Sequence, residues 1–459
     1  MKKVTVEELL EKAKKPSRLA IEYHKFYEGK LQVMPKCAIR SLYDFAIWYT
    51  PGVAAPCRII KDDPDESFEY TNRWNYVAVV SDGTRVLGLG DIGPEAGLPV
   101  MEGKAILFKY LGGVDAFPIV LSTKDPDEII QALKWIEPTF GGVNLEDIAS
   151  PKCYYVLEKA REELNIPVWH DDQQGTATVV LAAFTNALKL LGKKMDEVKI
   201  AFIGAGAANL RTAIVFEKAG AKPENMILVD SKGILHANRK DMEAMKKENP
   251  WKYEWALKTN PDGISGGIAE ALTDADAVIA ASKPGPGVIK PEWIKQMKED
   301  PIVFAAANPI PEIWPWEAKE AGAKIIATGR SDFPNQINNS LGFPAIFRGV
   351  LDVKATTVTD EMCIAAANAL AEYAEQKGLS EDYIIPTMED WEVYIYEAVA
   401  AAEQSIKQGV ARVKLSRQEL WERASRIIRN ARESVHILMK AGLIQNPPPE
   451  DEVLKKYKG

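Results

Sequence analysis

The stretch KIAFIGAGAANL, residues 199–210, has the pattern of an apolar strand, a tight turn and the start of a helix. Gly204, Gly206 and Asn209 occupy the three positions of the GxGxxG pattern, in the strand-to-helix context that the pattern requires. The first glycine permits a tight turn, and the second lets a pyrophosphate approach the helix amino terminus, where free N–H groups favour an anion. We therefore predict a dinucleotide-binding fold around this stretch.

Asn209 is the one departure from the pattern. The third position usually serves close packing of helix on strand, so Asn209 either displaces the helix outward or makes a hydrogen bond of its own. A turn of this kind by itself often only reverses the chain, but an acidic strand end follows it, which favours a nucleotide site. The predicted cofactor-binding residues of the turn are Gly204, Ala205, Gly206, Ala207, Ala208 and Asn209.

The second apolar run, MILVD, ends in Asp230, at the spacing where a carboxylate accepts hydrogen bonds from the adenosine ribose. Taken alone, Asp230 favours NAD. Lys232 and Arg239 follow closely, and either side chain could neutralise the additional phosphate of NADP. The sequence therefore predicts NAD or NADP without choosing between them.

Apolar runs alternate with helical segments after residue 177, which predicts a parallel sheet covered by helices on both faces. These runs are residues 199–204, 226–230, 276–282, 301–307 and 324–329. Three earlier strand-like runs end in polar or acidic residues, where sites often lie, and they are residues 76–81, 115–122 and 166–171. The sequence thus indicates a second α/β region before the nucleotide-binding one.

We predict an α/β protein with three parts. Residues 1–172 form an N-terminal α/β substrate and metal domain, and residues 173–337 form a doubly wound Rossmann-like NAD(P) domain. Residues 338–459 form a mainly helical segment that packs back on the other two. The active site is expected in the cleft between the domains.

Helix signals are clear at both ends of the chain. Thr5 with Glu8, and Ser416 with Glu419, have the spacing of capping boxes, and the second opens a helix with one apolar stripe. The stripe has the form of a core or subunit-interface face. The proline-rich tail, residues 446–459, is predicted to be extended.

Bulk properties exclude several classes of protein. The net charge of -8 and the pI near 5.4 argue against a broad nucleic-acid surface. Four scattered cysteines suggest neither a zinc site nor a disulfide framework. No apolar run approaches the roughly 18 residues of a membrane span, so a cytoplasmic location without a membrane partner is expected.

Four carboxylates lie at two predicted strand ends, Glu146 and Asp147 in NLEDI and Asp171 and Asp172 in HDDQQGTA. Either pair alone is compatible with a helix start or cap, where acidic residues are favoured. Adjacent residues on a strand face opposite ways, so joint ligation by Glu146 and Asp147 requires the chain to turn. Together the four acids repel one another and call for a cation, and oxygen-only ligands select Mg²⁺ or Mn²⁺.

Two further residues have ordinary and catalytic interpretations. Lys104, in MEGKAILF, is either an ordinary lysine at a helix start or a buried base. Tyr49, in IWYTPGVA, precedes a turn, where a tyrosine is commonly half-buried packing, and nothing local distinguishes it.

Taken together, these segments resemble the malic enzyme family in its short prokaryotic form. The matching blocks run in family order over roughly residues 20 to 360, whereas the last hundred residues match less distinctively. The blocks are YTPGVA (49–54), SDGTRVLGLGDIGPEAGLPVMEGKA (81–105), FGGVNLEDIASP (140–151), HDDQQGTA (170–177), ANPIPE (307–312) and TGRSDFPNQINNSLGFPAIFRG (328–349).

The resemblance implies oxidation of (S)-malate by NAD or NADP, followed by metal-assisted loss of carbon dioxide to give pyruvate. It assigns Glu146, Asp147 and Asp172 as ligands of Mg²⁺ or Mn²⁺. Lys104 resembles the general base, helped by Asp171. A lysine acts as a base near neutral pH only if burial or a nearby cation lowers its pKa.

The remaining roles also follow from the resemblance. Tyr49 matches the acid that protonates the enol of pyruvate, and Arg85 matches the arginine that binds a substrate carboxylate. Asn308, Asn338 and Asn339 match positions that contact substrate or nicotinamide, although each is also a normal turn residue. Independently of the resemblance, Asp230 and Lys232 complete the predicted cofactor-binding set.

Two other functions stay open. Malolactic enzymes share the scaffold and metal site but convert malate to lactate and carbon dioxide, and no residue excludes that reaction. A non-catalytic nucleotide-binding protein on the same scaffold is a different class, with Asn209 as its possible sign. The family is usually oligomeric, so a homo-oligomer, a dimer or higher, is expected.

Overall fold

The computed structural model describes residues 6–86 and 88–457, and side chains from residue 14 onward. Its first sheet has the order β2-β1-β3-β4, and every strand pair is parallel. The strands are β1 (Tyr76–Ser81), β2 (Asp115–Val120), β3 (Gly142–Leu145) and β4 (Val168–His170). Strands β1, β2 and β4 fall within the predicted runs. Strand β3 ends directly before Glu146, as the predicted strand end there requires, but its range could not be predicted because its four residues, GVNL, include a glycine and an asparagine.

The second sheet has six strands in the order β10-β9-β8-β5-β6-β7. All pairs are parallel except β6 with the short β7. The strands are β5 (Ile200–Ile203), β6 (Met226–Asp230), β7 (Gly233–Ile234), β8 (Ala277–Ala280), β9 (Ile302–Ala305) and β10 (Ile325–Thr328). Their residues are almost all buried, which confirms the prediction of a parallel sheet covered on both faces.

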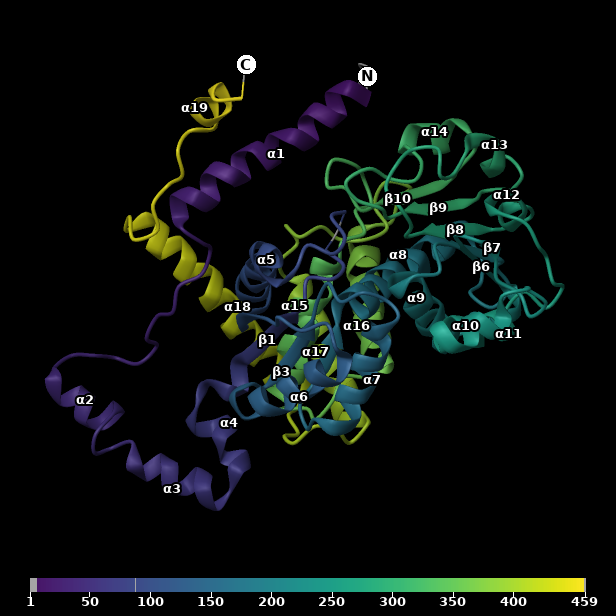
Figure 1. The fold of residues 1–459 in the computed structure, drawn as a ribbon. Coiled ribbons are helices and arrows are strands. Elements are labelled where there is room, and N and C mark those ends of the chain that lie inside the picture. Colours follow the sequence, from purple (N-terminus) through teal and green to yellow (C-terminus); the bar gives the residue numbers. More distant parts are fainter. Residues whose placement is uncertain (1–5, 87, 458–459) are drawn as a thin grey trace.

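Helices surround both sheets (Figure 1). Around the first sheet lie α5 (Pro94–Gly112), α6 (Pro126–Ile136) and α7 (Lys152–Glu163). The second is accompanied by α8 (Thr176–Leu191), α9 (Ala207–Lys218), α10 (Met242–Glu248), α11 (Pro250–Lys258), α12 (Ile268–Leu272), α13 (Pro291–Ile294) and α14 (Pro315–Glu320).

The helices after residue 342 return to the first sheet. They are α15 (Phe343–Asp352), α16 (Asp360–Lys377), α17 (Val393–Lys407) and α18 (Arg417–Lys440). The rings of Phe343 and Phe347 lie 4.7 and 5.2 Å from that of Phe108 on α5, in one buried apolar cluster with β1. The C-terminal segment therefore completes the core of the N-terminal domain.

The capping box at the start of α18 is present as predicted. The backbone N–H and the hydroxyl of Ser416 donate to the Glu419 carboxylate at 2.8 and 2.7 Å. The predicted apolar stripe contributes Leu420, Ala424 and Ala431 to the buried face of this helix.

The proline-rich tail is not wholly extended, contrary to the prediction. Helix α19 (Glu450–Lys455) begins directly after the prolines and places three acidic residues in its first turn, where the helix dipole favours them. It lies beside α1 (Val6–Tyr27), and Lys456 pairs with Glu22 at 2.6 Å. Thr5 of the first predicted capping box lies outside the described residues. In the part of the chain that the structure describes, no helix is both long and apolar enough to span a membrane.

Helices α2 (Leu42–Trp48) and α3 (Ala54–Asp62) stand apart from the rest of the molecule (Figure 1, lower left). The chain rejoins the body at the short α4 (Ser67–Tyr70), where Phe68 is buried in the core.

Candidate active site

The predicted carboxylates meet at one edge of the first sheet. Strands β3 and β4 are parallel neighbours, so the residues that follow them lie side by side. One oxygen from each of Glu146, Asp147 and Asp172 lies within 4.8 Å of the other two. Asp147 has φ of 55°, so the chain turns sharply here, as joint ligation by two adjacent residues requires.

Lys104 reaches this cluster from α5. Its Nζ donates to Asp171 Oδ2 at 2.6 Å and lies 3.0 Å from Glu146 Oε1, and the side chain is only 8% exposed. The ring of Phe343 covers Nζ at 4.3 Å. The catalytic interpretation of Lys104 as a buried residue therefore agrees with its position, and its ordinary interpretation as an exposed lysine at a helix start is wrong.

The electrostatics follow from burial and crowding. Burial raises the pKa of Glu146, Asp171 and Asp172 above the ordinary range, although Lys104 opposes the shift. Neighbouring carboxylates raise the pKa of Glu146 and Asp171 further. Burial and the neighbouring Asp172 raise the pKa of Asp147 to about 8. Four carboxyl groups at one strand edge thus resist ionisation together unless a cation joins them.

For Lys104, burial acts to lower the pKa, but Asp171 and Glu146 raise it above the ordinary value. The expectation of a lowered pKa is therefore not met by the protein groups alone. A divalent cation bound to these carboxylates would offset the negative charge of Asp171 and Glu146 and so lower the pKa of Lys104. A lowered pKa is what a lysine needs to act as a base.

The donor set fits a hard divalent cation. All the candidate ligand atoms are carboxylate oxygens, and the buried Asp147 Oδ2 has no hydrogen-bond partner among the described residues. Lys104 contacts two of the four carboxyl groups, Glu146 and Asp171, so a further cation would relieve the repulsion that remains among them.

Two supporting residues were missed by the sequence analysis. Asn144 Nδ2 donates to Glu146 Oε2 at 2.9 Å, and Trp169 Nε1 donates to Asp171 Oδ1 at 3.1 Å. Each stands two residues before the carboxylate that it orients. Since alternate strand residues share a face, this spacing was a usable signal.

Arg85 and Tyr49 differ in their relation to the cluster. The backbone N–H of Arg85 donates to the carbonyl of Asp147 at 2.9 Å, and its exposed guanidinium acts to lower the pKa of Asp147 and Asp172. Tyr49 ends α2, outside the body of the molecule, and is 72% exposed. The structure therefore brings Arg85 to the site but leaves Tyr49 away from it in the same chain.

The three asparagines of the predicted site occupy different places. Asn339 Nδ2 donates to Asp171 Oδ2 at 2.5 Å, so it belongs to the Lys104 network. Asn338 caps a short 3-10 turn by accepting the N–H of Ser340 at 2.9 Å. Asn308 follows β9 and lies over Gly329, where an added Cβ would come within 2.5 Å of its Nδ2.

The glycine turn has the expected form. Gly204 has φ of 96°, and an added Cβ there would lie 2.6 Å from the carbonyl oxygen of Ala281, so only glycine suits this position. Gly206 has open space where a Cβ would point, which leaves room for a ligand at the start of α9, formed by Ala207 and Ala208 onward. Ala205 is buried behind the turn.

Asn209 makes hydrogen bonds of its own. It is 1% exposed, and its Nδ2 donates to the carbonyls of Ile203 at 2.9 Å and Ile279 at 3.3 Å. Its amide thus connects α9 to β5 and β8 by hydrogen bonds. This agrees with the prediction that Asn209 makes a hydrogen bond of its own and not with the alternative that it displaces the helix outward. This side chain is directed into the protein, so it is not itself a cofactor ligand.

Asp230, at the end of β6, is surrounded by basic groups. Its Oδ1 accepts from the N–H of Lys232 at 2.8 Å and from Arg239 at 3.0 Å, and Lys252 lies 3.3 Å from its Oδ2. Sequence reasoning missed Lys252, which is 22 residues away along the chain. The Nζ of Lys232 pairs instead with Asp241 at 3.1 Å.

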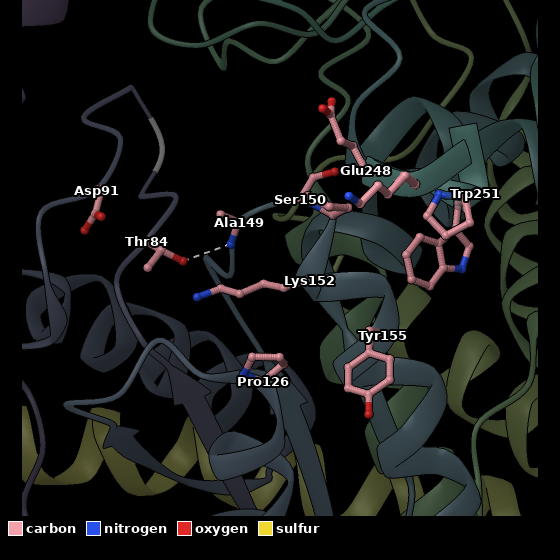
Figure 2. Close-up of a pocket in the computed structure, with 12 residues that line it drawn as sticks. Thr84, Asp91, Pro126, Ala149, Ser150, Lys152, Tyr155, Glu248 and Trp251 are labelled. Carbon is pink, nitrogen blue, oxygen red and sulfur yellow. Dashed lines mark hydrogen bonds between the residues drawn. The ribbon is translucent and has the colours of Figure 1, made fainter. Parts of the chain in front are cut away.

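A cavity of about 510 Å³ lies between the two α/β domains (Figure 2). Thr84, Ser150 and Lys152 line it from one side, and Glu248 and Trp251 from the other. The N–H of Ala149 donates to Thr84 at 3.0 Å on its wall, two residues after Asp147. The cavity therefore adjoins the carboxylate cluster but does not contain it.

Family models match both halves of the chain. The model of the malic enzyme N-terminal domain matches residues 28–161, and that of the malic enzyme NAD binding domain matches residues 173–406. The first includes Glu146 and Asp147, which follow β3. The second begins at Gln173, directly after Asp172, and includes the glycine turn.

Several similar proteins have names that agree with these models. The bifunctional malic/malolactic enzyme of Bacillus subtilis is 47% identical over 89% of this chain and 97% of its own. The NAD-dependent malic enzyme of Geobacillus stearothermophilus is 48% identical over 84% and 78%. The NADP-dependent malic enzyme of Escherichia coli K12 is 43% identical, and the match covers 85% of this chain but 52% of that longer protein.

Solved structures agree in fold over nearly the whole chain. The Entamoeba histolytica malic enzyme superposes with a TM-score of 0.95 at 47% identity, over 100% of this chain and 97% of that one. The Pyrococcus horikoshii malic enzyme gives a TM-score of 0.88 at 51% identity, over 95% and 99%.

A dinucleotide-binding sheet beside a buried cluster of carboxylates and a lysine defines a nicotinamide-dependent oxidoreductase with a site for a divalent cation. Within that class, the chain belongs to the malic enzyme family.

Proposed function

We propose that this protein oxidises (S)-malate with NAD or NADP and decarboxylates the resulting oxaloacetate to pyruvate and carbon dioxide. The observation that supports this reaction best is the contact of Lys104 with both Asp171 and Glu146, at 2.6 and 3.0 Å, inside a cluster of potential metal ligands. It places a proton-transferring group beside the oxygens that would hold the cation and, through it, the substrate.

When bound by Glu146, Asp147 and Asp172, a divalent cation supplies polarisation of the malate C2 oxygen and stabilises negative charge as carbon dioxide leaves. Lys104 Nζ takes the proton of the malate hydroxyl as the C2 hydride passes to the nicotinamide. Asp171 Oδ2 holds Nζ in place, and Asn339 holds Asp171.

Two further residues complete the reaction. The guanidinium of Arg85, at the exposed side of the cluster, pairs with a malate carboxylate. After decarboxylation, the Tyr49 hydroxyl returns one proton to C3 of the enol, which gives pyruvate. The proton taken from the hydroxyl and the proton returned to carbon then balance.

The test follows reduced-cofactor absorbance and pyruvate together, with purified protein, (S)-malate and Mn²⁺, with and without EDTA. We expect equal amounts of both products, and none of either once EDTA removes the cation. Absence of turnover under all these conditions would contradict the proposal.

Malolactic chemistry is the second candidate, favoured by the 47% identity to a bifunctional malic/malolactic enzyme. It uses the same cluster but returns the hydride to pyruvate before the cofactor leaves. The same assay separates the two functions because lactate would then form without release of reduced cofactor.

Either coenzyme is compatible with the end of β6, and we propose that Asp230 favours NAD. Arg239 and Lys252 partly neutralise Asp230, so these cations would also meet the additional phosphate of NADP. Replacing Asp230 by serine should lower KM for NADP relative to KM for NAD. An unchanged KM ratio would remove Asp230 from the assignment.

We propose in addition a cytoplasmic location and a homo-oligomeric state, a dimer or higher. The oligomeric state is open to a direct measurement of mass in solution by sedimentation.

A further inference from the structure

Glu312 is a buried carboxylate that the proposed reaction does not use. Its exposed fraction is 0%. Among the residues that the structure describes, only neutral groups donate hydrogen bonds to it. A buried carboxylate without a cation is costly unless hydrogen bonds satisfy both of its oxygens, so this side chain requires an explanation.

The donors to Glu312 come from two loops, the β8 loop (residues 281–290) and the β9 loop (residues 306–314). Its Oε1 accepts from the backbone N–H and the hydroxyl of Ser282, at 2.8 and 3.0 Å, and its Oε2 accepts from the N–H of Ala307 at 3.1 Å. Burial raises the pKa of this carboxyl above its ordinary value, although these hydrogen bonds oppose the shift. The carboxylate of one residue thus holds the β8 loop against the β9 loop.

The order of strands places both loops on one side of the cofactor site. In the second sheet β9 and β8 lie on one side of β5, and β6 lies on the other (Figure 1). The glycine turn follows β5, and Asp230 ends β6. A dinucleotide with its pyrophosphate at the glycine turn and its adenosine ribose at Asp230 extends its nicotinamide half towards β8 and β9.

Two contacts place these loops beside the cofactor. An added Cβ on Gly204 would lie 3.1 Å from the Cα of Ser282, so the β8 loop borders the glycine turn. Asn308, which is predicted to contact substrate or nicotinamide, directly follows Ala307 in the β9 loop. The two groups that Glu312 fixes are therefore neighbours of the cofactor site.

We propose that Glu312 is a positioning residue for the nicotinamide half of the cofactor. It holds the β8 and β9 loops in one arrangement, so that Ser282 and Asn308 keep their places as the nicotinamide binds. Glu312 acts through these loops, because it is buried beneath them. This role rests on the proposed orientation of the cofactor, with its adenosine ribose at Asp230, and not on the proposed reaction with malate.

The pattern of donors explains why the residue is a glutamate. A carboxylate accepts at both oxygens, whereas the amide of glutamine accepts at one atom and donates at the other. In Glu312→Gln the NH₂ group would face the N–H of either Ser282 or Ala307, donor against donor. One buried N–H would lose its acceptor, and one of the two loops would no longer be held.

The binding of two ligands to Glu312→Gln tests the proposal. ADP-ribose contains the adenosine, the pyrophosphate and the second ribose of NADH but lacks the nicotinamide. Calorimetric titrations without malate or divalent cation give both dissociation constants. We expect the Kd of NADH to rise at least ~10-fold and that of ADP-ribose to change less than ~2-fold. Should the wild-type protein bind NADPH more tightly, NADPH and 2′-phospho-ADP-ribose replace the two ligands.

The matched control is Glu317→Gln. Glu317 is a second carboxylate of the same segment, and it accepts the backbone N–H of Trp314 at 3.2 Å at the start of its own helix, α14. Its replacement should change neither dissociation constant.

Ser282→Ala is a milder variant that removes the hydroxyl hydrogen bond and leaves Glu312 in place. It should raise the Kd of NADH roughly 2- to 5-fold, again without an effect on ADP-ribose. This variant provides the test if Glu312→Gln does not fold.

A selective loss of NADH binding supports the proposed role. An equal loss for NADH and ADP-ribose would show that Glu312 only supports the domain as a whole, and it would overturn the proposal. Unchanged NADH binding would overturn it as well. Because no titration contains malate, a protein that shows the selective loss but turns over no malate would contradict the proposed function and leave the role of Glu312 intact.

Discussion

Asp172 joins the two strand ends of the cluster, because its Oδ2 accepts the backbone N–H of Asp147 at 2.9 Å. An asparagine there can keep this hydrogen bond but removes one ligand charge. We expect Asp172→Asn to raise the Mn²⁺ concentration for half-maximal activity at least ~10-fold, with the fold intact. Activity titrations with Mn²⁺ measure this shift, and circular dichroism checks the fold. Unchanged Mn²⁺ dependence would remove Asp172 from the ligands.

The raised pKa of Asp147, about 8 against an ordinary 3.8, links stability to pH and to the cation. Because the folded state binds this proton more tightly, the group's contribution to stability is complete below about pH 4 and is lost as pH rises towards 8. A divalent cation binds the ionised form and reverses the loss.

We therefore expect the increase in Tm on adding Mn²⁺ to be larger at about pH 8 than at about pH 6. Thermal melts in EDTA and in Mn²⁺ at the two pH values measure the difference. Asp147→Asn is the control, because it should reduce the pH dependence in EDTA. An equal Mn²⁺ effect at both pH values would contradict this linkage.

At the scale of elements, α18 depends on its first turn for a defined start. There the N–H of Ser416 donates to the Glu419 carboxylate, and the N–H of Glu419 donates to the Ser416 hydroxyl. Because the second hydrogen bond is lost without the hydroxyl, Ser416→Ala should lower the free energy of unfolding by about 1 kcal/mol. Urea denaturation measures the change as a lower midpoint. Ser434→Ala in the exposed middle of the same helix is the control and should not destabilise, because its hydroxyl only bonds back to the carbonyl of Asn430.

At the scale of the whole molecule, one buried carboxylate connects three helices. Asp360, on α16, lies 3.4 Å from Arg211 on α9, and its charge acts to raise the pKa of the buried Arg161 on α7. Arg211 also donates to Gln173 at 3.2 Å, next to the metal ligand Asp172. This network links the nucleotide domain to the carboxylate cluster.

Asp360→Asn leaves two buried guanidinium groups without their carboxylate, so we expect a loss of about 3–5 kcal/mol in the free energy of unfolding. Lys218, which pairs with Asp360 at 3.1 Å but is 40% exposed, provides the comparison. Lys218→Gln should cost less than ~1 kcal/mol. Denaturant titration measures the free energy of unfolding of both variants. An equal loss for Asp360→Asn and Lys218→Gln would contradict the prediction that the buried arginines make Asp360→Asn the more destabilising change.

Much of the fold could be predicted because its signals are local. Parallel strands buried on both faces are short apolar runs, and the turn at Gly204 and Gly206 has a pattern of its own. The range of β3 could not be predicted because the strand is short and contains glycine, and helix α19 was not predicted because it follows three prolines. In both cases packing against neighbouring elements overrides a weak local preference.

The sequence by itself determined the residue types of the site and their order: the carboxylates after β3 and β4, Lys104, and the glycine turn of the nucleotide domain. Only the tertiary structure decided their distances, because contacts such as Asn339 with Asp171 join residues 168 positions apart, which no local spacing encodes. It also decided that Tyr49, at the exposed end of α2, lies away from the carboxylate cluster of its own chain, because the path of α2 relative to the first sheet is not encoded in any local pattern.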